Sequence, residues 1–449
     1  MKKNLKYKFQ RKTILRHLND RSLGLINLTK PSSIYNIEKH LPYFWTKKPI
    51  ETEKHNKIFA SQWITNDSVV YGTKCNRLYW LNVETQKSFQ IPLIQGISRD
   101  DQQNALIDEP STNFGIHAIK KNISETLLAT GGDNVNSVGI YIIPEFKPQF
   151  VLEKFHSDAI FDICWLDDSH VATCSRDSKM GIWCINPDEV KFDSEYYTRS
   201  PRINSPWVTS ESTIGALHMP QSKLCFDGIQ NRFRAMEYIQ ATNKLLIATM
   251  SNKLYSFDPS QSIEDCEQVF SFKTIIQDMV AIRKWPLHPH SFAVGGQAKF
   301  AIYDTRKQGD GKNVLALNQN AGIRSLAFKD YVISYGTAEG HINFFDLRAN
   351  RHLEAKSFCN SQQNSPSDSS YYSCVSPFSN SYSEPNFTYN NLLQLRMEGV
   401  VEQSDIGRAL NSPQTAIYTH EYDPTRTKLF AAGGPIAACY TGQAACLFE

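Results

Sequence analysis

The sequence of 449 residues predicts an all-β fold made of repeated units, on three observations. First, residues 322–348 superimpose without a gap on residues 159–185, and each segment contains three short apolar strands separated by turns. Second, the strands are runs of five or six β-branched and aromatic residues between Gly, Asn and Asp turns, a pattern typical of antiparallel hairpins. Third, no 3.6-residue periodicity of apolar residues runs between Ile58 and Phe344, which argues against helices.

This pattern of three short strands separated by turns occurs seven times along the chain. Its copies begin at Lys57, Gly115, Ala159, Arg232, Asp278, Gly322 and Ala416. Units spaced about 40–60 residues apart with this hairpin pattern are typical of four-stranded propeller blades, not of helical repeats. We therefore predict a seven-bladed WD-repeat β-propeller over residues 41–449.

The aromatic residue that closes the third strand differs between copies, so the Trp-Asp signature of such repeats is degenerate. It is Trp80, Tyr141, Trp183, Phe257, Tyr303 or Phe345. The pattern leaves open which strand closes the ring. A segment before Lys57 and the C-terminal AACLFE are both candidates.

Three stretches fall outside the repeat. Residues 1–40 are predicted to form a basic N-terminal tail with a short helix around Thr13–Leu18. Residues 186–230 are predicted to be an insertion between the third and fourth blades. Residues from about 350 to 412 form a Ser/Asn-rich loop, and we expect about 356–390 to be disordered because such a composition buries too little apolar surface to offset its ordering entropy.

Charge and composition exclude several protein classes. Residues 1–21 carry a net charge of +7, so the rest of the chain contributes −4 to the total of +3. A globally basic surface for nucleic acid is therefore not expected, and the tail fits nuclear import better than RNA or DNA contact. No run of eighteen apolar residues and no apolar segment after the N-terminal charges occurs, so neither a membrane span nor a secretory signal is expected. The ten cysteines contain no CxxC pair and are expected to be reduced thiols of an intracellular protein.

No motif for catalysis, a cofactor or a metal stands out. The phosphate-loop-like residues 309–313 lack the strand–loop–helix context and the Ser or Thr that such loops need. The sequence His288-Pro289-His290 suggests no third metal ligand. We therefore expect neither enzymatic activity nor a cofactor.

The start of each innermost strand is a candidate site, because equivalent residues of the blades lie at one height around the central channel. These residues are Phe59, His117, Phe161, Arg234, Val280, Arg324 and Tyr418. Packing of a buried inner strand would favour apolar residues here, so two arginines and a histidine are unusual.

The second turn of each repeat lies on the same face of a propeller and carries Lys74 and Arg176. Together with the inner-strand residues they predict a basic pocket on an otherwise acidic body. Its members are Lys57, Lys74, His117, Arg176, Arg232, Arg234 and Arg324. Arginine suits carboxylate or phosphate, so a short acidic peptide or a chain terminus is the expected ligand. The alternative is that each of these side chains is a solvated rim charge.

The opposite face is marked by two phrases of an aromatic residue followed by Asp-x-Arg. They contain Asp304 with Arg306, and Asp346 with Arg348. Two interpretations remain open: a local pairing of Asp with Arg across the turn, and a docking surface with both arginines presented from adjacent blades.

Several of these phrases resemble the WD-repeat substrate receptors of cullin-4 RING ubiquitin ligases, and most of all their cullin-4-associated factor twelve branch. The phrases include NKIFASQW (56–63), GTKCN (72–76), GIHAI (115–119), SRDSKMGIW (175–183) and GIRS (322–325). The resemblance implies a non-catalytic receptor that docks on the ligase's three-propeller adaptor, the damaged-DNA-binding protein, and through it on cullin-4. It also implies a location in the cytoplasm and nucleus, with centrosomal association in the family.

The resemblance assigns roles to the residues above. It places adaptor docking at Asp304, Arg306, Asp346 and Arg348, with the helix around 13–18 as a second contact. It implies that the basic pocket binds protein C-termini that end in two glutamates. The rival hypothesis is a propeller scaffold, without a ligase, that binds an acidic or phosphorylated partner. Membranes and nucleic acids are not expected as partners.

Overall fold

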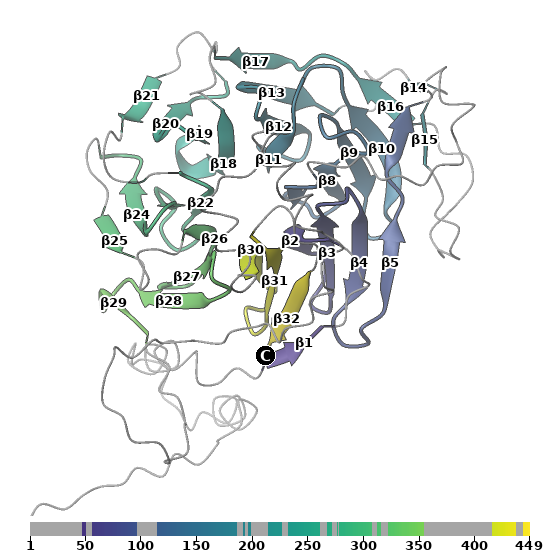
Figure 1. Cartoon of the computed structure of the whole chain (residues 1–449). Coiled ribbons are helices and arrows are strands. Elements are labelled where there is room, and N and C mark those ends of the chain that lie inside the picture. Colours follow the sequence, from purple (N-terminus) through teal and green to yellow (C-terminus); the bar gives the residue numbers. More distant parts are fainter. Residues whose placement is uncertain are drawn as a thin grey trace, which may run out of the picture.

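The computed structural model describes residues 47–50, 56–96, 115–185, 192–193, 196–198, 214–226, 232–260, 267–271, 276, 278–307, 312–315, 322–353, 415–436 and 443–449. Seven of the eight sheets that these residues form are arranged as blades around a central axis (Figure 1), so the predicted seven-bladed all-β propeller is confirmed. Among the described residues the one helical element is a 3-10 turn, η2 (Gln240–Thr242), and no helix is long and apolar enough to cross a membrane. The helix expected around 13–18 and the disorder expected at 356–390 lie outside the described residues.

The blades follow one another along the chain, and the strands of each blade are named in order from the innermost to the outermost. Blade 1 contains β2 (Ile58–Trp63), β3 (Ser68–Thr73), β4 (Leu78–Asn82) and β5 (Ser88–Ile91). Blade 2 contains β7 (Ile119–Lys121), β8 (Leu127–Gly131), β9 (Val138–Ile142) and β10 (Lys147–Leu152). Blade 3 contains β11 (Ile160–Trp165), β12 (His170–Ser175), β13 (Lys179–Cys184) and β17 (Ser222–Cys225). Blade 4 contains β18 (Phe233–Ile239), β19 (Lys244–Thr249), β20 (Lys253–Phe257) and β21 (Glu267–Ser271). Blade 5 contains β22 (Ala281–Lys284), β23 (Ser291–Gly295), β24 (Lys299–Asp304) and β25 (Lys312–Leu315). Blade 6 contains β26 (Ile323–Lys329), β27 (Val332–Thr337), β28 (Ile342–Asp346) and β29 (Arg351–His352). Blade 7 contains β30 (Thr415–Tyr422), β31 (Leu429–Pro435), β32 (Ala444–Phe448) and β1 (Lys47–Pro49).

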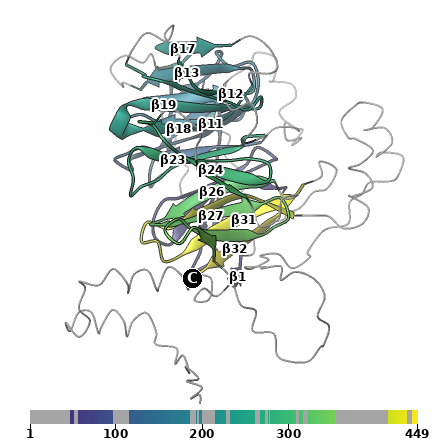
Figure 2. The same cartoon turned by 90° about the vertical axis from the view of Figure 1, so that its left-hand side faces the viewer.

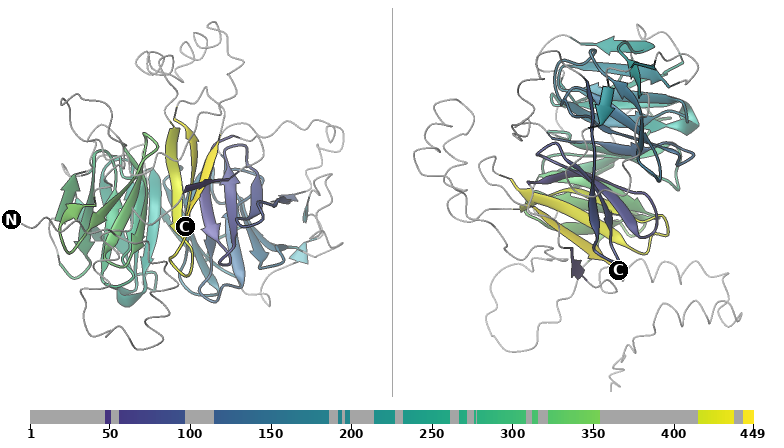
Figure 3. Two further views of the ribbon diagram at one scale, coloured as in Figure 1. Left: turned by 90° about the horizontal axis from the view of Figure 1, so that it is seen from below. Right: turned by 90° about the vertical axis from the view of Figure 1, so that its right-hand side faces the viewer.

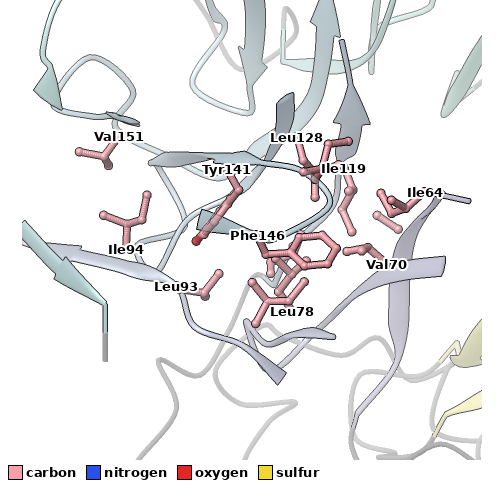
Figure 4. Packing of buried hydrophobic residues seen from close by; sticks show 14 of the residues in the cluster. Ile64, Val70, Leu78, Leu93, Ile94, Ile119, Leu128, Tyr141, Phe146 and Val151 are labelled. Carbon is pink, nitrogen blue, oxygen red and sulfur yellow. The ribbon is translucent and has the colours of Figure 1, made fainter. Parts of the chain in front are cut away.

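The hydrophobic core lies between neighbouring blades, where the faces of two sheets meet. Val70 and Leu78 of blade 1 belong to one buried cluster with Ile119, Leu128 and Phe146 of blade 2 (Figure 4). The second strands β3, β27 and β31 are buried at every position, which explains their continuous apolar and small residues. Burial of each large apolar side chain contributes about 1.5–3 kcal/mol, so every blade is stabilised by both of its neighbours.

The ring is closed by both of the segments that the sequence left as candidates. Residues 444–448 form β32, and β1 from the N-terminal side pairs antiparallel with it, Lys47 opposite Phe448 and Pro49 opposite Cys446. Blade 7 (yellow) thus lies between the purple strands of blade 1 and the green strands of blade 6 (Figure 3). A sheet built from the two distant parts of the chain holds the ring shut.

The stretch 186–230 contributes strands to two blades. Its β17 is the outer strand of blade 3 and pairs with β13. Before that, β16 (Ile214–Leu217) adds to blade 2 in parallel with β10, and β14 (Phe192–Asp193) pairs with β16. A further strand, β15 (Tyr196–Thr198), pairs with β6 (Ile94–Gly96). These strands lie on the outer rim of the propeller. The side view also shows blade 3 and blade 7 on opposite sides of the ring (Figure 2).

Candidate functional site

A β-bulge occurs at the start of the innermost strand in five of the seven blades. The ladder skips one residue at Phe59, Phe161, Arg234, Arg324 and Tyr418. A bulged residue is left out of the ladder and its side chain is redirected. These five side chains, with His117 and Val280 in the other two blades, are partly exposed between fully buried neighbours. We call these seven residues the mouth ring.

Four members of the mouth ring form a continuous aromatic arc that crosses four blades. The rings of Phe59 and His117 stack with centroids 4.6 Å apart and an interplanar angle of 9°. Tyr418 lies edge-on to Phe59 at 5.1 Å, and Phe161 lies edge-on to His117 at 4.9 Å. Contacts between side chains of different blades show that these side chains converge at the channel.

Beside the Phe161 end of the aromatic arc lie two arginines of the mouth ring, Arg234 and Arg324. The Arg234 guanidinium lies over the ring of Phe161, 4.3 Å from its centroid, in a cation–π contact. Burial lowers the pKa of Arg234 to about 10, and repulsion from Arg324 adds to this effect. The pKa of Tyr418 is raised by burial, although Arg324 and Arg234 oppose that shift. Two cations therefore share this sector of the mouth at an electrostatic cost.

The Nε–H group of Arg324 is buried and donates to no acceptor within the described residues. An unsatisfied buried donor costs about 1–3 kcal/mol, and more when the group is charged. An anion at this position would accept that hydrogen bond and offset the repulsion between Arg234 and Arg324. The sector is therefore electrostatically complementary to a carboxylate or phosphate.

The second turns lie on the same face as the mouth ring, as the sequence predicted. In blades 1, 3 and 4 the N–H of a residue in this turn donates to the carbonyl just before or at the start of the inner strand. Lys74 donates to Lys57 at 2.8 Å, Arg176 to Ala159 at 2.9 Å and Met250 to Arg232 at 2.9 Å. The predicted pocket residues are thus gathered at one end of the channel.

The pocket cations differ in how their charges are engaged. Lys57 is buried, and its Nζ donates to the carbonyl oxygen of Ile436 at 3.4 Å. The guanidinium of Arg176 is held by Asp158, with Nε to Oδ2 at 2.7 Å and Nη2 to Oδ1 at 2.9 Å. Lys74 and Arg232 are partly exposed at the rim. Sequence reasoning missed Asp158, although it precedes the repeat by one residue, where a counter-charge could have been sought.

On the opposite face, the two Asp-x-Arg phrases differ from each other. Asp304 forms a bidentate ion pair with Arg306, at 2.9 and 2.7 Å, and this pair lowers the pKa of the carboxyl. The Arg306 side chain is 62% exposed. Asp346 is fully buried, and its Oδ1 accepts the N–H groups of Arg348 and Ala349 at 2.9 and 3.1 Å.

These contacts assign the aspartates to turn structure. The guanidinium of Arg348 lies 4.4 Å from the ring centroid of Tyr331. Both turns lie beside the turns between first and second strands, since Thr305 N–H donates to His290 at 2.8 Å and Leu347 N–H to Tyr331 at 2.9 Å. The arginines, not the aspartates, are the groups of these phrases that face outward.

An aromatic cluster that the sequence did not reveal adjoins Arg348. Trp285 stacks nearly parallel to Phe328, with ring centroids 5.8 Å apart, and lies edge-on to Tyr331 at 6.0 Å. His288 packs on Trp285 with ring centroids 4.1 Å apart, and Leu287 is 42% exposed.

Within the described residues no group of three or more His, Cys, Asp or Glu is placed to share a metal ion.

Comparisons with known proteins agree with this architecture. The WD40 repeats of RRP9 in a crystal structure superimpose with a TM-score of 0.55 at 10% sequence identity. That match covers 90% of this chain and 97% of that chain, and it shows a shared fold. A family model described as the DDB1- and CUL4-associated factor 12 beta propeller matches residues 41–449. Because this match spans most of the sequence, the chain belongs to the family of DDB1- and CUL4-associated factor 12 β-propellers.

Proposed function

We propose that this protein is a non-catalytic substrate receptor of a cullin-4 RING ubiquitin ligase. Its channel mouth binds acidic C-termini of the Glu-Glu type, and its opposite face docks on the ligase adaptor DDB1. Family membership supports the ligase assignment, because the family is described by association with DDB1 and CUL4. The cytoplasm and nucleus are the proposed locations.

The observation that carries the substrate proposal is the arginine pair at the mouth. Arg324 has a buried Nε–H without an acceptor among the described residues, and the pKa of Arg234 is lowered by burial and by Arg324. A chain end of two glutamates brings three carboxylates close together. Guanidinium groups bind carboxylates through two parallel hydrogen bonds, and each charge-assisted bond contributes about 1.5–3 kcal/mol.

The aromatic arc limits where such a ligand lies. Phe59, His117, Phe161 and Tyr418 pack against one another and leave the arginine sector as the polar part of the mouth ring. A carboxylate would bind there, while the methylene groups of glutamate would lie against the rings. Lys74 and Arg232 at the rim add long-range attraction that depends on salt.

Substrate and adaptor can bind at the same time, because the two surfaces lie at opposite ends of the blade strands. The mouth ring is at the start of the first strands, whereas Arg306 and Arg348 follow the ends of the third strands. A five- or six-residue strand spans about 17–20 Å, which is more than a Debye length at physiological ionic strength. The charges at one surface therefore have little effect on binding at the other.

The substrate half of the proposal is tested by fluorescence anisotropy with a labelled peptide that ends in Glu-Glu. We expect Arg324→Gln to weaken binding at least about tenfold, from the loss of one charge-assisted contact. The same peptide with an amidated C-terminus should bind weakly to the wild type. The matched control is Lys147→Gln, which removes one exposed cation at the start of β10 on the other face. Equal affinity for the Glu-Glu and Gln-Gln peptides would contradict the proposal.

The adaptor half is tested separately by co-migration with purified DDB1 on a sizing column. We expect co-migration of the wild type and its loss in the double variant Arg306→Ala/Arg348→Ala, with peptide binding unchanged. Peptide binding without adaptor binding would favour the rival hypothesis of a scaffold that recognises acidic or phosphorylated partners.

A further inference from the structure

We infer that Asp158 is an affinity-tuning residue that acts as an internal counter-charge at the channel mouth. It neutralises Arg176 and thereby limits how strongly the mouth attracts acidic chain ends. The inference rests on the proposed function, because it concerns the affinity of that same site.

The Asp158–Arg176 pair is bidentate and partly shielded from water. The two hydrogen bonds are 2.7 and 2.9 Å long, and the side chains of Arg176 and Asp158 are 28% and 26% exposed. Arg176 nevertheless acts on the mouth ring, since its charge contributes to the lowered pKa of Arg234. A carboxylate bound near Arg234 would thus experience the charge of Arg176, which the bidentate pairing with Asp158 offsets.

The carboxylate of Asp158 is held in place by a rigid surrounding. Its Oδ1 accepts the N–H of Ala159 at 2.7 Å, and its carbonyl oxygen accepts the hydroxyl of Ser175 at 2.9 Å. The preceding residue Ser157 donates its N–H to Asp177 at 2.8 Å. These bonds fix the loop that leads into β11, so the counter-charge does not depend on a freely rotating side chain.

Blade 1 contains the same arrangement with a neutral residue. Asn56 Oδ1 accepts the N–H of Lys57 at 2.9 Å, as Asp158 Oδ1 accepts that of Ala159. The second-turn residue Lys74 also donates its N–H to Lys57, as Arg176 does to Ala159. Asn56 and Asp158 are therefore equivalent positions. The chain has an amide at one of these positions and a carboxylate at the other.

The local turn does not require a carboxylate, since Asn56 makes the same backbone hydrogen bond. What Asp158 adds is a negative charge. A unit charge roughly 8 Å from a ligand carboxylate, at an effective dielectric constant of about 40, changes affinity about fivefold. With Asp158 in place, the strong anion site is confined to the sector of Arg234 and Arg324, and acidic peptides bind less tightly in proportion to their charge.

The test compares four proteins in the Glu-Glu peptide assay: wild type, Asp158→Asn, Arg176→Gln and the double variant. We expect Asp158→Asn to bind about fivefold tighter and Arg176→Gln about fivefold weaker. The double variant should return to within about twofold of the wild type, because it removes one charge of each sign. Asp158→Asn should also bind the amidated peptide more tightly, but by a smaller factor, because that peptide carries one carboxylate fewer.

Glu145→Gln is the matched control, because Glu145 is exposed in the turn between β9 and β10 on the other face. It removes one negative charge and should leave affinity unchanged. Weaker binding by Asp158→Asn would overturn the inference, since Asp158 would then orient Arg176 for direct contact. Equal weakening in Arg176→Gln and in the double variant would overturn it too. If the wild type binds no acidic peptide, the proposed function is wrong, and the inference that depends on it is wrong too.

Discussion

The burial of His420 predicts that the stability of this propeller depends on pH. It is buried where blades 6 and 7 meet, with Nδ1 at 2.7 Å from the Ser325 hydroxyl and Nε2 at 2.9 Å from the Ser334 hydroxyl. Burial lowers the pKa of His420 to about 3, and the nearby charge of Arg283 adds to the shift. The imidazole is therefore neutral in the folded protein at any pH above about 4.

The perturbation is a change from pH 7.5 to pH 5. The unfolded chain has a histidine pKa of about 6.5 and takes up a proton over this interval, whereas folded His420 does not. Its contribution to the free energy of unfolding is thus complete above about pH 6.5 and is lost as the pH falls. At pH 5 the loss is about 2 kcal/mol, from roughly 1.5 pH units at about 1.36 kcal/mol each.

The measurement is urea unfolding at both pH values for the wild type and for His420→Gln. The variant is expected to be less stable at pH 7.5, because the serine hydroxyls lose a partner. The informative quantity is the difference between the two pH values, which should be about 2 kcal/mol smaller in the variant. His352, whose pKa burial lowers to about 4, has the same effect in both proteins and cancels. An unchanged pH dependence in His420→Gln would show that His420 does not take up a proton on unfolding in this interval.

Three further predictions concern the mouth, a close approach of strands and ring closure. Phe161→Leu removes the ring over which Arg234 lies, and because the free protein already makes this cation–π contact, we expect the free energy of unfolding in urea to fall by roughly 1–2 kcal/mol. Gly433→Ala would place a Cβ against the backbone carbonyl of Ala416, and because that backbone cannot move aside, we expect about 3 kcal/mol of destabilisation or more in urea unfolding. Deletion of residues 1–50 removes β1 and should lower the melting temperature and speed proteolysis, whereas an unchanged melting curve would show that β1 is not needed to keep the ring closed.

Much of the fold was predictable because it depends on short-range patterns. The alternation of β-branched residues with Gly, Asn and Asp turns determines hairpins locally, and seven repetitions leave few alternatives to a propeller. The mouth ring was predictable for the same reason. Equivalent positions in a repeat have equivalent geometry, and the structure places all seven members between buried neighbours.

The pairing of β1 with β32 and of β16 with β10 was not predictable in this way. Both pairings join segments that lie far apart in the sequence and that belong to no complete copy of the repeat. Edge strands of two to four residues carry too little apolar periodicity to be recognised. Their partners are selected by whichever sheet edge lies within reach once the blades have packed.

The candidate site likewise has some features that follow from the sequence repeat and others that depend on how the blades pack. The repeat in the sequence predicts which face collects the cations, because it assigns Arg176, Arg234 and Arg324 to defined heights on the blades. The environment of each charge became visible in the folded chain: Arg176 is neutralised by Asp158, while Arg234 and Arg324 repel each other beside an Nε–H that has no acceptor among the described residues. Strand formation depends on neighbours along the chain, whereas the state of a charge depends on burial and on the groups that packing brings within a few ångströms of it.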